Sequence, residues 1–457
     1  MRLIWGAVAL AVVGAIPAAQ AETLTDALIS AYRNSHLLEQ NQAVLRAADE
    51  DVATAVGSLL PVLSYLATTT WSRAPSLFSS TPTDKTSGSL ALSASMPILD
   101  FGRGKANVAI KNEIVLATQQ SLVNIEQQVL LDAVSAYVNM GLQSELVAAQ
   151  QSNVRLISQD LKAAQDRFEV GEVTKTDVAL AEAQLASANA QLAASQGAYN
   201  VARERYNATI GHYPDHLVGL PRPPHTAGKV DDARAVALRN HPVILQDSHQ
   251  AKAADLGVEL AKAQMRPTLN ATASVTDPFD VKGLGTISES VGLQFSQTLY
   301  AGGRLSSGFR QAIARQQAAH AALLQDGVNA SEAVGKAWSN ILVANASIAA
   351  QDEQIRAAQA AYDGVKQEAD LGSRTTLDVL NAEQTLLSAR ASRLQAGANL
   401  YVSQYQLLSA MGLLTASHLH LGIPTFDPEA YYNAVKKAPA TSSQGARLDR
   451  ILKTLGK

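Results

Sequence analysis

The chain carries one motif twice: Arg167-Phe-Glu-Val-Gly-Glu-Val-Thr-Lys-Thr-Asp-Val178 and, further on, Lys366-Gln-Glu-Ala-Asp-Leu-Gly-Ser-Arg-Thr-Thr-Leu-Asp-Val379. Gly171 in the first copy and Gly372 in the second lie 201 positions apart, and each interrupts two stretches with helical patterning. Glycine reverses a chain at low cost because it adopts positive φ angles that other residues avoid. We therefore expect a helix-reversing turn at each glycine, in a chain built from two copies of one unit.

The repeat extends over almost the whole sequence. Further pairs at the offset of 201 are Gly102 with Gly303 and Gly211 with Gly412, and at an offset of 206 Asn34-Ser-His36 pairs with Asn240-His-Pro242. The change of offset means that the first copy has five extra residues between positions 61 and 102. We predict a first repeat at 22–210, a proline-rich linker at 211–229, a second repeat at 230–421 and a flexible C-terminal tail at 422–457.

The N-terminus has the form of an export signal. Arg2 precedes an apolar stretch from Leu3 to Ile16, and the segment 1–21 ends on Ala19-Gln-Ala21, the small-x-small pattern of a cleavage site. No cysteine follows the cleavage point, which excludes a lipid anchor there. We expect an exported protein that is periplasmic, secreted or held in an outer membrane by strands.

Composition excludes several classes of function. The chain has no cysteine, which removes disulfides, thiolate catalysis and cysteine-ligated metals. Its 37 basic and 40 acidic side chains give no broad positive field, so nucleic acid is not an expected partner. His212-Tyr-Pro-Asp-His216 has a metal-like histidine spacing, but Pro214 disrupts the helix that would align the two rings and no third ligand is evident. We expect no cofactor, no metal and no enzyme activity.

Each repeat predicts a helical stretch, at 24–58 and 230–265, followed by two strands, at 60–100 and 266–300. Apolar residues alternate with small polar ones along these strands, as a half-buried sheet requires. The apolar positions are Leu63, Tyr65, Ala67, Thr69 and Trp71, then Leu90, Leu92, Ala94 and Met96, and in the second copy Leu269, Ala271, Ala273 and Val275, then Val291, Leu293 and Phe295. Polar loops at 72–88 and 276–289 are expected to join the strands of each pair.

Two long helices complete each repeat, at 102–170 and 176–210 and again at 303–371 and 376–411. At ~1.5 Å per residue, the first would be a rod of roughly 100 Å. The shorter helices carry seven-residue rows, which are typical of a coiled-coil seam. These rows are Val178, Leu185, Leu192, Tyr199 and Tyr206 beside Ala181, Ala188, Ser195 and Ala202, and then Val379, Leu386, Arg393, Leu400 and Leu407 beside Ala382, Ala389, Ala396 and Ser403. Only Arg393 interrupts the pattern.

Four strands with one apolar and one polar face cannot close a membrane barrel, because such barrels have at least eight strands. An open sheet would leave its edges unpaired. The chain is therefore expected to oligomerise and pool its strands around a water-filled pore. Tyr65, Trp71 and Phe295 would then face lipid near the membrane interfaces.

The doubled turn motif, the strand-to-helix junctions Met96-Pro-Ile-Leu-Asp-Phe-Gly102 and Thr298-Leu-Tyr-Ala-Gly-Gly303, and the signal peptide together resemble the TolC-like outer-membrane efflux proteins. The likeness covers nearly all of the mature chain to about residue 421. It implies a homotrimer with a twelve-stranded barrel in the outer membrane of a Gram-negative bacterium and a long periplasmic α-helical tunnel. It also implies an adaptor protein and an inner-membrane pump of the RND, ABC or MFS class, in drug efflux or type I secretion.

The resemblance also implies a periplasmic gate at the helix-reversing turns. Carried over to this sequence, Arg374 would face Thr176 and Asp177, and Asp378 would supply one carboxylate per protomer to a ring across the pore. The alternative is that both aspartates only cap the returning helices, for which Thr176 and Asp177 are suitable N-cap types. Two family positions differ, because a gate tyrosine falls at Ala369 and a second pore aspartate at Asn381.

Two other interpretations remain open at this point. Gly302 and Gly303 open a helix after a strand, but the rest of a phosphate-binding fingerprint is missing, so we expect Gly102, Gly302 and Gly303 to serve as strand-to-helix junctions. A periplasmic coiled-coil adaptor of an efflux system would also have long helical hairpins. An adaptor needs a compact β-rich module at the hairpin base, whereas this chain offers two similar strand pairs.

Overall fold

The protein is described here by a computed structural model that covers residues 21–76, 79–224, 226–280, 283–284, 286–424, 426–436, 447 and 450. The predicted signal peptide, apart from Ala21, lies outside the described residues.

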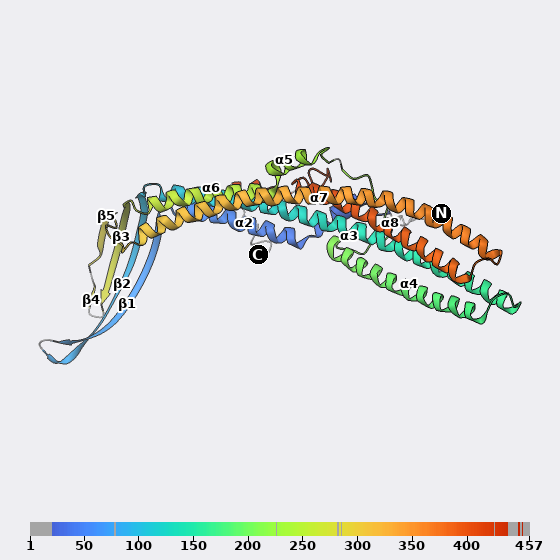
Figure 1. Ribbon diagram of the computed structural model, residues 1–457. Helices are drawn as coiled ribbons and strands as arrows, with labels where there is room; N and C mark the ends of the chain where they lie inside the picture. The colour runs from blue at the N-terminus through green and yellow to red at the C-terminus, as the bar shows by residue number, and fades with distance from the viewer. Residues whose placement is uncertain are drawn as a thin grey trace, which may run out of the picture.

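The molecule is an elongated rod with strands at one end and helix-reversing turns at the other (Figure 1). Two 67-residue helices, α3 (Arg103–Glu169) and α7 (Arg304–Asp370), run along most of its length. The helices α4 (Lys175–Ile210) and α8 (Thr376–Ala410) return beside them. No helix among the described residues is both long enough and apolar enough to cross a membrane.

The returning helices pack through the predicted heptad rows. Ala181, Ala188 and Ala202 are buried on α4, as are Ala389 and Ala396 on α8. Small side chains at these positions let neighbouring helices approach closely, so the seam excludes water with little side-chain volume.

The one interruption of the rows, Arg393, has a structural explanation. Its Nε lies 3.1 Å from Oδ1 of Asp352 on α7, so the guanidinium at this position forms an ion pair across the hairpin.

Each predicted helical stretch near the start of a repeat is helical, and each is divided into two helices. The first stretch divides into α1 (Leu24–Asn34) and α2 (His36–Gly57), and the second into α5 (Val230–Asn240) and α6 (Pro242–Ala263). The Ser35 hydroxyl accepts a hydrogen bond from the Leu38 N–H, and Pro242 occupies the first turn of α6, where its missing N–H costs nothing. Both breaks lie at the repeated Asn34-Ser-His36 and Asn240-His-Pro242 motif.

The strands form one antiparallel sheet in the order β1 (Val62–Ser76), β2 (Ser79–Leu99), β3 (Thr268–Asp280) and β5 (Ser288–Ser296), with a short β4 (Gly283–Leu284) also beside β3. Its register aligns the predicted faces. One row runs through Tyr65, Leu92 and Val275, and the neighbouring row on the other face consists of Ser64, Ser93, Ser274 and Ser290. The serine hydroxyls pair at 2.8 Å across β1 and β2 and again across β3 and β5.

The predicted loops at 72–88 and 276–289 are largely strand, which corrects the sequence-based expectation. Pairing of β1 with β2 continues to Ser76 and Ser79, and Arg73 and Asp84 form a cross-strand ion pair at 3.4 Å. Threonine and serine fit a pleated ladder when backbone pairing continues, so polar composition alone did not mark a loop.

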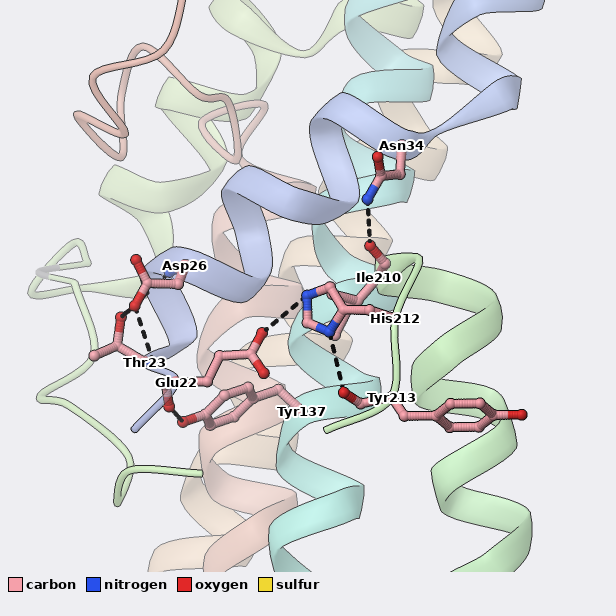
Figure 2. A network of polar contacts seen from close by, with 8 residues as sticks. All are labelled: Glu22, Thr23, Asp26, Asn34, Tyr137, Ile210, His212 and Tyr213. Atoms are coloured by element: carbon pink, nitrogen blue, oxygen red, sulfur yellow. Dashed lines mark hydrogen bonds and ion pairs between the residues drawn. The ribbon is translucent and has the colours of Figure 1, made fainter. Parts of the chain in front are cut away.

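The largest apolar core lies where α1, α3, α4 and α8 meet, around Leu130, Tyr137, Tyr206 and Leu408. The start of the described chain is fixed to this core (Figure 2). The Tyr137 hydroxyl, a single donor, lies within hydrogen-bonding distance of two backbone oxygens, that of Glu22 at 2.9 Å and that of Val218 at 2.7 Å. One buried side chain therefore holds both the N-terminal segment and the linker between the repeats.

Part of the predicted flexible tail is a docked helix, so that prediction is wrong for residues 426–436. Helix α9 (Pro428–Val435) lies against α2, where Phe426 and Tyr432 join an apolar cluster. The Tyr431 hydroxyl donates to Glu50 Oε1 at 2.8 Å. Beyond this helix, the described residues are Lys436, Arg447 and Arg450.

A glycine pair tests how tightly the end of α8 packs. Gly412 (φ +76°) and Gly422 (φ +67°) both adopt the left-handed conformation, but a Cβ on Gly412 would lie 2.6 Å from the Asn240 carbonyl oxygen, whereas one on Gly422 would meet open space. Alanine at either position should cost about 1 kcal/mol of backbone strain, and Gly412→Ala should cost more because of the clash. Urea unfolding followed by circular dichroism should show the lower midpoint for Gly412→Ala. Equal midpoints would contradict the packing described here.

Candidate functional site: the turns at the helical tip

The two predicted reversals occur at Gly171 (φ +82°) and Gly372 (φ +77°). At the first, the Glu172 N–H donates to the Arg167 carbonyl at 2.9 Å, and at the second, the Ser373 N–H donates to the Glu368 carbonyl at the same distance. This pattern satisfies carbonyls that a helix end would otherwise leave unpaired. The two repeats therefore use the same turn, and both turns lie at the same end of the rod (Figure 1).

Each returning helix begins with a reciprocal capping box. Asp177 Oδ2 accepts the Thr174 N–H at 2.8 Å, while the Thr174 hydroxyl accepts the Asp177 N–H at 3.3 Å. Thr375 and Asp378 repeat this arrangement at 3.0 and 3.3 Å. The N-caps are thus Thr174 and Thr375, so the interpretation of Thr176 and Asp177 as N-caps is wrong, but Asp177 and Asp378 do cap the returning helices as the third residue of each box.

Hydrogen bonding at these caps keeps both aspartates charged. The backbone N–H and hydroxyl of Thr174 lower the pKa of Asp177, and those of Thr375 lower the pKa of Asp378, with a smaller contribution from Arg374. A hydrogen bond to a carboxylate stabilises its ionised form. Each turn therefore presents a fixed negative charge at the tip.

A cavity of about 610 Å³ separates the two turns. Asp177 and Arg374 both line it, as does Ala369, whereas Thr176 and Asp378 are not among its lining residues. Arg374 Nε lies 2.8 Å from Glu368 Oε2 on its own helical hairpin. Within one chain the structure thus brings Arg374 to the same cavity as Asp177, and it pairs the guanidinium with a glutamate that sequence reasoning had not singled out.

A buried carboxyl group, Glu383, lies close to Asp160 and Lys366, which line this cavity, and the sequence did not single it out. Glu383 on α8 is 5% exposed, and neither carboxylate oxygen has a hydrogen-bond partner among the described residues. Burial, followed by the charge of Asp160, raises the pKa of Glu383 to about 7, while Lys366 acts in the opposite direction. A signal was present, because Val379, Glu383 and Leu386 have the i, i+4, i+7 spacing of one helix face.

The strand-to-helix junctions form as predicted at Gly102 (φ +92°), Gly302 (φ +58°) and Gly303 (φ +81°). At the first junction the Asp100 carboxylate accepts the N–H groups of Gly102 at 2.9 Å and Gly104 at 2.7 Å. These contacts satisfy backbone N–H groups at the start of α3, where the chain passes from strand to helix.

The histidine motif at 212–216 is part of the anchor for the N-terminal segment. His212 Nε2 lies 3.5 Å from Glu22 Oε1, and its Nδ1 lies 3.2 Å from the Tyr213 carbonyl oxygen (Figure 2). No group of three or more side chains suited to a metal gathers anywhere in the described part of the chain.

A sheet with one apolar face joined to 67-residue helices that reverse at paired glycine turns defines the fold of an outer-membrane channel subunit. The family model described as outer membrane efflux protein matches residues 28–212 and 234–413. The chain belongs to this outer membrane efflux protein family, which confirms the resemblance read from its motifs.

Individual relatives agree with this assignment. The outer membrane efflux protein BepC of Brucella suis is 34% identical over 92% of this chain and 91% of its own length. The outer membrane protein TolC of Escherichia coli is 27% identical over 94% and 90%. The alkaline protease secretion protein AprF of Pseudomonas aeruginosa is 24% identical over 73% and 72%.

Solved structures show the same fold. CusC superposes with a TM-score of 0.76 at 20% identity, covering 85% of this chain and 92% of CusC. VceC of Vibrio cholerae gives 0.73 at 22% identity, covering 85% of this chain and 96% of VceC. The protein is therefore an outer-membrane efflux channel protein. The alternative of a periplasmic adaptor is not supported, and the relatives named here are efflux and secretion proteins rather than enzymes.

The buried glutamate predicts a pH-dependent stability. Burial raises the pKa of Glu383 in the folded protein, so folding favours the neutral acid. The folded protein is therefore most stable below the ordinary pKa of this group and loses stability as pH rises through about 7. Glu383→Gln should therefore stabilise the protein at pH 8.5, by up to ~3 kcal/mol, and have little effect at pH 4.5. Urea unfolding at the two pH values measures the difference, and Glu182→Gln, at an exposed position on α4, is a control. An equal effect at both pH values would contradict the assignment.

Proposed function

We propose that the protein is the outer-membrane conduit of a tripartite efflux or type I secretion system. It would conduct substrates passively from an inner-membrane pump across the periplasm and the outer membrane. The observation that carries this proposal is the combination, in one chain, of a two-faced sheet and helices of roughly 100 Å. Such a length is far beyond the needs of a globular domain and suits a tunnel that spans a compartment.

The proposed assembly is a homotrimer with a twelve-stranded barrel. Support comes from the sheet, whose outer strands β1 and β5 each pair on only one side within the described chain. Leu63, Tyr65, Val291 and Phe295 are large apolar side chains exposed on it. Closing the sheet with two further copies would pair the edges and give the apolar face to outer-membrane lipid. A detergent-solubilised particle with the mass of one chain would contradict this proposal.

The proposed lumen is lined by small hydroxyl side chains. The serine row formed by Ser64, Ser93, Ser274 and Ser290 lies on the face opposite the apolar rows. A surface of serine hydroxyls is easily hydrated and favours no particular class of substrate. We therefore expect the partner pump to select the cargo. A gene-deletion panel scored for drug sensitivity and for loss of secreted proteins separates efflux from secretion.

The proposed partners are a periplasmic adaptor and an inner-membrane pump of the RND, ABC or MFS class. Relatives named for efflux and for protease secretion support the general arrangement. The adaptor is proposed to engage the helical tip and open it. Closure would depend on Arg374, Thr176, Asp177 and Asp378, with helix reversal at the two turn glycines.

The gate is proposed to be held by weak, reversible contacts. Arg374 and Glu368 are both about half exposed, and exposed ion pairs contribute ~0 to 1 kcal/mol each. Arg374 and Asp177 line the same cavity, so the proposed contact between them would form across it. With Ala369 and Asn381 at the two divergent positions, we expect fewer links than in the family pattern and a single ring of three carboxylates.

Removing these contacts should open the channel. Arg374→Ala or Asp177→Ala should raise the single-channel conductance in planar bilayers, because either change removes a charge that we propose holds the entrance shut. Arg315→Ala removes an exposed arginine on α7 far from the tip and should leave conductance unchanged. Unchanged conductance in both tip variants would discard the gate assignment.

Asp378 should govern ion preference. Because a ring of carboxylates attracts cations, Asp378→Asn should move the reversal potential in a salt gradient toward zero. The asparagine can still accept the Thr375 N–H as a capping group, so the turn should remain folded. If the reversal potential does not change, the proposed ring is wrong.

A further inference from the structure

An aspartate occupies the same position in both repeats, but only one of the two aspartates has polar partners. Asp49 on α2 corresponds to Asp255 on α6 at the offset of 206. Asp255 is partly exposed, and its Oδ1 lies 2.8 Å from Gln316 Nε2 and 2.9 Å from His320 Nε2 on α7. Those two contacts lower the pKa of Asp255. In the second repeat, this carboxylate is well accommodated in its charged form.

The first repeat lacks the two side chains that pair with Asp255 in the second repeat. At the offset of 201, Gln316 and His320 correspond to Val115 and Gln119 on α3. Val115 is buried in an apolar cluster with Leu45 and Val52. Asp49 is 0% exposed, and neither of its oxygens has a hydrogen-bond partner among the described residues. A carboxylate without partners is costly to bury, so this site favours the neutral acid.

Helix α9 is the element that distinguishes this site from its counterpart. Phe426 and Tyr432 pack on the cluster of Leu45, Val52 and Val115, which is the face of α2 that carries Asp49. The Tyr432 hydroxyl donates to Asn112 Oδ1 at 3.0 Å, and the Tyr431 hydroxyl to Glu50. Helix α9 thus lies over a carboxyl group that lacks the polar partners of its counterpart.

The charged groups around Asp49 do not neutralise it. On α2, Glu50 acts unfavourably on Asp49, and Arg46 acts on Tyr431. On α3, Lys111 is paired with Asp51 at 2.7 Å. On α9, Tyr431 and Tyr432 lie close enough to Asp49 for its charge to act on them, and Glu429 is exposed. Lys436 Nζ donates to Asn433 and lies 5.5 Å from the centre of the Tyr432 ring. Burial first, and then Glu50, raise the pKa of Asp49 to about 6.

We propose that α9 is a proton-dependent strap, docked on α2 while the Asp49 carboxyl is neutral and released when that carboxyl ionises. The docked form binds the proton more tightly than the released form, so acid favours docking and the docking weakens as pH rises from about 4 to about 6. A separation of about two pKa units corresponds to a change of ~100-fold in the ratio of released to docked strap. This inference does not depend on the proposed gate or its partners.

A nitroxide spin label on α9 tests the strap. The chain has no cysteine, so Ala430→Cys provides a single labelling position on the exposed side of the helix. The label on the otherwise native, full-length protein should be more mobile at pH 7.5 than at pH 4.5, with the change falling between about pH 4 and about pH 6. Circular dichroism at both pH values should show unchanged helix content. An equal line shape at the two pH values would overturn the proposal.

Three variants of the labelled protein test whether the pH response of the label comes from the Asp49 carboxyl group. Asp49→Asn should keep the strap docked throughout the pH range, whereas Asp255→Asn, the matched change in the other repeat, should behave as the parent. Val115→Gln restores the amide that the second repeat uses, so it should lower the midpoint. A pH response that is the same in Asp49→Asn as in the parent would overturn the proposal. If Asp49→Asn does not fold, an unchanged midpoint in Val115→Gln would overturn it instead.

Discussion

Backbone hydrogen bonding at the two outer strands is the constraint on which the rest of the structure depends. In the described chain, β1 and β5 bound the sheet, and each has one side without a strand partner. Unpaired backbone groups are expensive in lipid, where no water replaces the missing bonds. The sheet therefore needs further strands, and everything attached to it must be compatible with a closed ring of identical chains. The apolar and polar rows of the sheet assign the outside and the inside of that ring.

The long helices continue from the sheet and extend far from it. Because Asp100 caps the start of α3 and Gly102, Gly302 and Gly303 turn the chain at the strand ends, the helices leave the sheet as continuous rods. Alanine rows keep the rods close together, and the core around Tyr137 and Tyr206 fixes them in the middle of the molecule. The tip holds a cavity and the exposed ion pair of Arg374 with Glu368.

The duplication preserves the backbone more strictly than the side-chain chemistry. Both turns have the same hydrogen bonds, and both returning helices have the same capping box. The carboxylates at Asp49 and Asp255 occupy matching positions, yet one is buried beneath α9 and the other is paired with Gln316 and His320. A repeat in which backbone geometry is fixed by glycines and caps can vary its packed surfaces independently in each copy.

The sequence by itself determined the elements whose signals are local. The doubled glycine motif gave the turns, the 3.5-residue rows gave the helical hairpins, and the alternation gave the faces of the sheet, because each depends on residues within a few positions of one another. The threonine caps at 174 and 375 were within reach of the same reasoning but were placed slightly too late.

Only the tertiary structure decided which side chains from distant segments meet. It paired the Tyr431 hydroxyl with Glu50, 381 positions away, and so fixed a helix in a segment whose composition indicated flexibility. It also buried Glu383 against two other helices and left Asp49 without a partner. The physical reason is that desolvation and ion pairing depend on the neighbours a residue acquires in space, and no local pattern records them.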